Sequence, residues 1–163
     1  MIIFLVIFLS FVFEYFINGF FHGTIFSGLI IFSSLILLEP FFKKNRDRYY
    51  VFCFLIGFLY DLVYSGTYFL NAGLFLFIGI IVSFINHITP NNLIVSILQL
   101  VFLIGLYRTL CFLFMVINGF IGFDFSILFE SIYSSIIINV IYGIILYFVL
   151  YLISLKFKIR RIK

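Results

Sequence analysis

Charge is scarce in this sequence. Only 10% of the 163 residues are charged and 66% are hydrophobic, with a mean hydropathy of +1.34. A soluble domain is about 25% charged and about 45–50% apolar, and a domain of about 150 residues still exposes roughly 30% of its chain surface. The composition therefore excludes a soluble globular protein and a disordered chain, and it leaves an integral membrane protein.

Cysteine is equally scarce, with only Cys53 and Cys111, both inside apolar runs. Two such residues exclude a disulfide scaffold and are expected to be small buried hydrophobes. No Cys/His spacing typical of a metal site occurs, so zinc and iron–sulfur chemistry have no support. A phosphate-binding loop, an HExxH motif and a Gly-x-Ser-x-Gly motif are also absent. No cofactor and no metal are therefore expected.

The apolar residues form long uninterrupted runs, as in 2–13 and 136–153. A membrane β-barrel needs alternation of apolar and polar residues, and only helices or closed barrels satisfy their backbone polar groups in lipid. The sequence thus predicts an all-α fold, a polytopic bundle of six transmembrane helices forming a single domain over 1–163. The expected spans are 2–20, 24–38, 49–64, 68–84, 93–117 and 126–155.

Nine of the ten basic residues lie in two segments, the loop 41–48 and the tail 156–163. Short cytoplasmic loops carry the Lys/Arg excess, so both segments are expected in the cytoplasm. Four predicted spans separate them and two precede the first, which places both termini in the cytoplasm. The first run lacks a basic leader and is predicted to be a retained helix. Anionic lipid headgroups account for the net charge of +4 without a nucleic-acid partner.

Glu14, Asp61, Arg108, Asp124 and Glu130 all fall in the outer half of the predicted bundle. A charge at the bilayer centre costs at least about 2.5–3.5 kcal/mol, so each should face protein or water. Arg108 is the only cation among them and is expected to pair with Asp61 or Glu14, with Glu130 as a third candidate. Three interpretations remain open: an ion pair that fixes helix contacts, a substrate pocket open to the outside, and a proton relay.

Small and polar residues predict close helix contacts. Gly57 and Asp61 are four residues apart and share one helix face. Gly57 would let a neighbouring helix approach, and Asp61 could then accept hydrogen bonds from Arg108 or from backbone N–H groups at the Gly66 turn. Asn139 lies deep in the sixth span and is expected to hydrogen-bond across helices.

Residues 57–66, GFLYDLVYSG, resemble the signature of the rod shape-determining MreD family, which carries a Gly-x-x-x-Asp-hydrophobic pattern at the end of its third span. The form Gly-Phe-Leu-Tyr-Asp is similar to the Gram-positive branch in particular, as is the acidic Glu14 in the first span. Asn139 falls where the family often has an Asn in its last span. The length, the six spans, the basic loop and the basic tail agree with the family as well.

The resemblance implies a non-enzymatic scaffold of the bacterial cell-wall elongation machinery, needed for peptidoglycan synthesis and rod cell shape, in the plasma membrane. The implied partner is an MreC-type single-pass membrane protein, with MreB, RodA and a transpeptidase close by. The family fold is similar to the substrate-binding subunits of energy-coupling-factor vitamin transporters, which defines the alternative function. Such subunits usually have an alanine-rich first span, whereas this chain has one alanine, Ala72, and a bulky first span.

Two further possibilities concern surface and chemistry. A lipid-modifying enzyme would need an acid/base group facing the membrane surface, for which Glu14, Asp61 and Glu130 are the candidates. The 27 phenylalanines could supply a lipid-facing groove for the transmembrane helix of a single-pass partner. An AT-rich genome would also favour phenylalanine. The sequence does not distinguish these two explanations of the phenylalanine content.

Overall fold

The computed structural model describes residues 2–20, 28–43, 45–65, 69–90 and 92–156. These residues form helices and no strand, which confirms the all-α prediction. The elements are α1 (Ile2–Phe20), α2 (Ile30–Leu38) with the 3₁₀ turn η1 (Glu39–Phe42), α3 (Arg46–Tyr60) with the π-helical turn η2 (Asp61–Ser65), α4 (Leu70–Ile88), α5 (Leu93–Ile117) and α6 (Phe125–Lys156).

Four of the described helices, α1, α4, α5 and α6, are long and apolar enough to cross a membrane. About 20 helical residues span the hydrocarbon core, so these helices indicate a multi-pass membrane protein. The sequence predicts six spans, and the other two are shorter here. The apolar stretch Ile30–Phe42 falls below the usual length, and α3 has 15 residues before its hydrogen-bonding pattern changes to that of η2.

Several helix ends differ from the sequence prediction. The second span is predicted to stop at Glu39-Pro40, but the chain continues through η1 because proline is tolerated in the first turn of a helix. Within the predicted loop 41–48, Arg46 already begins α3. The fourth span is predicted to end at residue 84, whereas α4 continues to Ile88.

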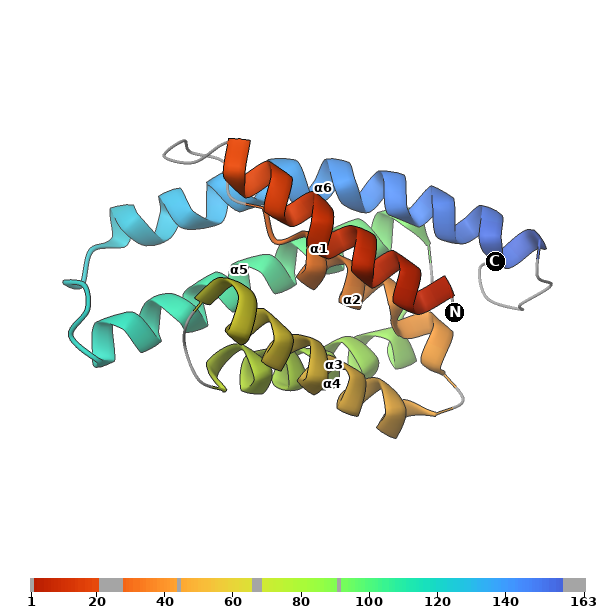
Figure 1. Ribbon diagram of the computed structural model, residues 1–163, viewed down its shortest axis with the longest axis horizontal. Coiled ribbons are helices and arrows are strands. Elements are labelled where there is room, and N and C mark those ends of the chain that lie inside the picture. Colours follow the sequence, from red (N-terminus) through yellow and green to blue (C-terminus); the bar gives the residue numbers. More distant parts are fainter. Residues whose placement is uncertain (1, 21–27, 44, 66–68, 91, 157–163) are drawn as a thin grey trace.

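The helices run back and forth along the long axis of the molecule (Figure 1). The starts of α1 and α3 and the ends of α4 and α6 lie toward one end of the molecule, and the ends of α3 and α5 lie toward the other (Figure 1). The helices α3 and α4 pack against each other, as do α5 and α6. The C-terminal part of α5 and the N-terminal part of α6 extend beyond the remaining helices (Figure 1).

The short helix α2 occupies the centre of the bundle. All nine of its residues are buried, and it contacts α1, α4, α5 and α6. The Phe32 ring lies 5.5 Å from that of Phe75 and 5.0 Å from that of Tyr107, measured between ring centroids. Because the start of α2 is buried, its backbone N–H groups need acceptors from the protein itself.

Candidate functional site

Three carboxylates are buried in the bundle. Glu14, Glu39 and Asp61 have exposed fractions of 0%, 1% and 2%. A buried carboxylate needs hydrogen-bond donors to offset the loss of water. The three groups therefore mark the points where the polar chemistry of this protein is concentrated.

Asp61 holds the start of α4. Its Oδ1 accepts from the backbone N–H of Asn71 (3.2 Å) and from Asn71 Nδ2 (2.9 Å), and its Oδ2 accepts from the backbone N–H of Ala72 (3.0 Å). The first N–H groups of a helix lack partners within the helix, and the helix dipole favours a negative charge there. Asp61 thus supplies the acceptors that the buried start of α4 requires.

Gly57 brings α3 and α4 into backbone contact one turn before Asp61. A Cβ at Gly57 would lie 2.5 Å from the Asn71 carbonyl oxygen and 2.7 Å from the Ala72 Cα. The Tyr107 hydroxyl on α5 donates to Asn71 Oδ1 at 2.6 Å and so connects α5 to the same point. The sequence predicts a glycine contact and a hydrogen-bonded carboxylate on one face of the third span, and the start of α4 supplies donors to that carboxylate.

Glu14 lies at the buried start of α2. Its Oε2 accepts from the backbone N–H of Ile31 at 2.8 Å. Its Oε1 has no hydrogen-bond partner in the part of the chain that the structure describes. The Glu14 carboxyl is therefore only half satisfied, although its side chain is fully buried.

Two asparagines complete the acceptors around the start of α2. Asn139 Oδ1 on α6 accepts from the backbone N–H of Leu29 and from Ser33 Oγ, both at 3.0 Å. The predicted hydrogen bonding of Asn139 across helices is thus confirmed. Asn18 Oδ1 on α1 accepts from the backbone N–H of Gly28 at 2.9 Å. Sequence reasoning missed Asn18, because a polar residue near a helix end is typical of a turn.

A cluster of three hydroxyl groups joins α1, α2 and α6. Ser10 Oγ lies 2.7 Å from Ser34 Oγ, and the Tyr142 hydroxyl lies 2.9 Å from Ser10 Oγ and 2.8 Å from Ser34 Oγ. Interhelical hydrogen bonds of this kind hold membrane helices together where lipid provides no hydrophobic driving force. Sequence reasoning did not single these residues out. Ser10 is four residues before Glu14, and this helical spacing was the available signal.

Glu39 is the third buried carboxylate, and sequence reasoning treated it only as a stop signal. Its Oε2 accepts from Asn86 Nδ2 at 2.7 Å, and its Oε1 accepts from Ser83 Oγ at 3.4 Å. Ser83 and Asn86 are three residues apart on one face of α4, which indicates a polar contact. Their partner Glu39 lies 44 residues before Ser83 and 47 before Asn86. The spacing of the two donors does not reveal a partner so distant in the sequence.

The remaining predicted residues are Arg108, Glu130 and Gly66. Arg108 on α5 is half-buried; its Nε donates to Ser135 Oγ at 2.8 Å, and its charge acts on Glu14. Glu130 is exposed on α6. Gly66 and most of the tail 156–163 lie outside the described residues.

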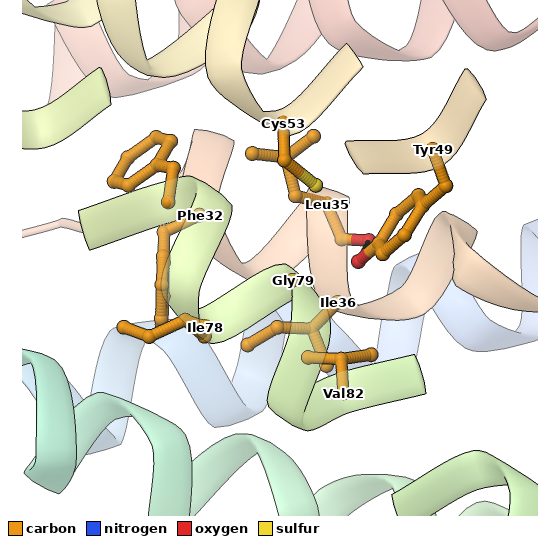
Figure 2. Close-up of a pocket in the computed structure, with 9 residues that line it drawn as sticks. Phe32, Leu35, Ile36, Tyr49, Cys53, Ile78, Gly79 and Val82 are labelled. Atoms are coloured by element: carbon orange, nitrogen blue, oxygen red, sulfur yellow. Dashed lines mark hydrogen bonds between the residues drawn. The ribbon is translucent and has the colours of Figure 1, made fainter. Parts of the chain in front are cut away.

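A small pocket lies between α2, α3 and α4, and Figure 2 shows its lining side chains, which include Phe32, Cys53 and Val82. Its empty volume is about 180 Å³, whereas ligand sites usually measure about 300–1,000 Å³. The Tyr49 hydroxyl at its edge already donates to the Leu35 carbonyl oxygen at 3.0 Å. This pocket therefore offers little to a polar ligand.

Within the described ranges, no group of three or more His, Cys, Asp or Glu side chains is placed to hold a metal ion. No model of a known protein family, no curated protein and no solved structure matches the chain. The chemistry of the buried carboxylates is thus the basis for assigning a function. These groups chiefly accept hydrogen bonds from other helices, which fits a role in holding a membrane bundle in one shape.

Proposed function

We propose that this chain is a non-enzymatic membrane scaffold of the bacterial cell-wall elongation machinery, similar to MreD proteins, and that it binds an MreC-type single-pass partner. The observation that carries the proposal is the joint between α3 and α4. Gly57 and Asp61 are the two residues that define the family-like signature, and both contact the start of α4. The part of the sequence that resembles the family is thus a structural element of the bundle.

The proposal includes six crossings of the plasma membrane with both termini in the cytoplasm. The successive elements alternate in direction along the long axis, and the start of α1 and the end of α6 lie at the same end (Figure 1). Under this topology, α2 with η1 and α3 with η2 are the second and third crossings. The basic residues of 41–48 and 156–163 then belong to one side, as the positive-inside rule requires.

The use of polar groups favours a scaffold over a vitamin-binding subunit. The side-chain oxygens of Asp61 and Asn139 accept hydrogen bonds from backbone N–H groups of neighbouring helices. The pocket between α2, α3 and α4 is apolar and smaller than usual ligand sites. The fold similarity to energy-coupling-factor subunits remains part of the proposal, and transport of a vitamin is the alternative that the experiment below distinguishes.

The partner helix would bind to an apolar outer face. Along α1, large side chains are exposed at Phe4, Phe8, Phe13 and Phe16. In lipid, helices associate through van der Waals contact and interhelical hydrogen bonds, for which large side chains offer area. MreB, RodA and the transpeptidase would then be reached through the MreC-type protein.

The test is copurification from bacterial membranes in mild detergent. Tagged wild-type protein, Asp61→Asn and the control Glu130→Gln are each coexpressed with an MreC-type protein, and their membrane levels are measured first. We expect wild type and Glu130→Gln to retain the MreC-type protein, because Glu130 is exposed and belongs to α6 and not to the α3–α4 joint. Asp61→Asn should accumulate but retain less of it, because one acceptor oxygen at the start of α4 is replaced by an amide donor.

Two results would reject the scaffold. In one, the MreC-type protein fails to copurify with wild type. In the other, an ABC-type ATPase and a coupling subunit copurify instead, which would favour the transport alternative. If all three forms retain the MreC-type protein, the scaffold proposal is supported, and Asp61 has no part in binding the partner.

A further inference from the structure

Glu14 differs from the other two buried carboxylates in how its oxygens are used. Both oxygens of Asp61 accept hydrogen bonds, and so do both oxygens of Glu39. In Glu14 only Oε2 accepts one, from Ile31, and Oε1 has no partner among the described residues. Glu14 is nevertheless the most deeply buried of the three, with an exposed fraction of 0%.

An ionised carboxylate spreads its charge over both oxygens, and each oxygen seeks donors. A buried polar atom without a partner costs about 1–3 kcal/mol, and more when it is charged. A proton on Oε1 removes both the charge and the unmet demand for donors. Oε2 can meanwhile continue to accept from the Ile31 N–H, as the carbonyl oxygen of a carboxylic acid.

Titratable side chains from α3, η2, α5 and α6 surround Glu14. Those interacting with it electrostatically are Tyr60 on α3, Tyr64 on η2, Tyr107 and Arg108 on α5, and Tyr142 on α6. Tyrosine hydroxyls are ordinarily neutral near pH 7. The guanidinium of Arg108 is the cation in this set; its charge acts on Glu14, and its Nε donates to Ser135 Oγ. The Tyr60 side chain faces the Glu14 carboxyl as well.

We propose that Glu14 is a proton-binding site inside the bundle, with the proton on Oε1 at neutral pH. The ligand is a proton, and the site joins α1 to the start of α2 through Oε2 and Ile31. This assignment is independent of the scaffold function, since it concerns one carboxyl group and would hold for a transport subunit as well.

Infrared spectroscopy tests the proposal directly. The full-length protein is purified in detergent at neutral pH with ¹³C-labelled glutamate carboxyls, so that only Glu14, Glu39 and Glu130 report, because these are the three glutamates of the chain. A protonated carboxylic acid has a C=O stretching band at higher frequency than a carboxylate. We expect this band in the wild type and its complete loss in Glu14→Gln.

The double variant Glu39→Gln/Glu130→Gln is the matched control, because Glu14 is then the only glutamate left. The band should remain in this variant. A wild-type spectrum without the band, or a double variant that lacks it, would overturn the proposal. The double variant decides the question even where Glu14→Gln fails to accumulate.

Stability provides a second readout. Glutamine copies a protonated Glu14, because its carbonyl can accept from Ile31 and its amide is a donor in place of the acid proton. Glu14→Gln should therefore unfold at about the same denaturant concentration as the wild type, whereas Glu14→Ala, which removes the acceptor, should unfold earlier. Equal loss of stability in both variants would contradict a protonated carboxyl.

Discussion

The backbone of Gly57 lies so close to the start of α4 that a Cβ at this position would come within 2.5 Å of the Asn71 carbonyl oxygen. One turn later, Asp61 accepts from the backbone N–H of the same Asn71. The two residues are halves of one joint: the glycine permits the approach, and the carboxylate supplies the acceptors for the helix start that the approach buries.

Substitution of Gly57 by alanine should destabilise the bundle. The added methyl group meets backbone atoms of Asn71 and Ala72, which cannot rotate away, so α3 and α4 must separate. Overfilled contacts of this kind cost about 1–3 kcal/mol. Unfolding in mixed detergent micelles measures the loss. Gly73→Ala on α4 is the control, since nothing lies within 4 Å of a Cβ there, and it should be neutral or slightly stabilising.

Removal of the Asn139 amide should weaken the attachment of α6 to α2. Asn139→Ala leaves the Leu29 N–H and the Ser33 hydroxyl without this acceptor. A buried donor left unpaired costs about 1–3 kcal/mol. The same unfolding assay applies, with Asn118→Ala as control, because Asn118 is exposed and bonds only within its own helix end. Equal behaviour of the two variants would contradict the role of Asn139.

Gly79 and Cys53 should show coupled effects. A Cβ at Gly79 would lie 2.8 Å from Cys53 Sγ, beside the pocket of Figure 2. Gly79→Ala should be destabilising, and Cys53→Ala in the same protein should recover part of the loss, because the obstructing sulfur is gone. Contacting residues show coupling energies of about 0.5–3 kcal/mol. A double-mutant cycle measures this coupling, and strictly additive effects would contradict the contact.

Asp124 should be sensitive to Ser126. The backbone N–H and the hydroxyl of Ser126 both donate to Asp124 Oδ1 at 2.8 Å and lower the pKa of this exposed carboxyl. Ser126→Ala should raise that pKa part of the way towards 3.8, since the backbone donor remains. Because the pKa of Asp124 is lowered in the folded state, the ionised carboxylate contributes to stability at neutral pH. That contribution is lost as the pH falls through the lowered pKa. Carboxyl ¹³C NMR follows the titration; an unchanged pKa would refute the contribution of the hydroxyl.

Much of the fold could be predicted from hydropathy, because apolar runs of about 20 residues have few alternatives to membrane helices. The runs at 2–20 and 93–117 match α1 and α5 at both ends. The short second span was predicted at 24–38, whereas α2 begins at Ile30, and the π turn after Tyr60 was not predicted. The start of α2 depends on hydrogen bonds to Asn139 and Glu14 on other helices, and these partners are distant in sequence.

The candidate site could be predicted only where its members are close in sequence. Gly57 and Asp61 are four residues apart, so their common face followed from helical spacing. Glu39 and its donors Ser83 and Asn86 belong to different helices, and no local pattern connects them. The contact of Arg108 Nε with Ser135 on α6 joins two helices in the same way and could not be read from local spacing.

The sequence by itself determined that this is a helical membrane protein, because its composition and the length of its apolar runs leave no other way to satisfy the backbone in lipid. The positions of its internal charges along each helix were determined in the same way. Only the tertiary structure decided what those charges do. Whether a carboxylate is fully hydrogen-bonded, as Asp61 is, or half satisfied, as Glu14 is, depends on which helix start comes to lie beside it in the folded bundle.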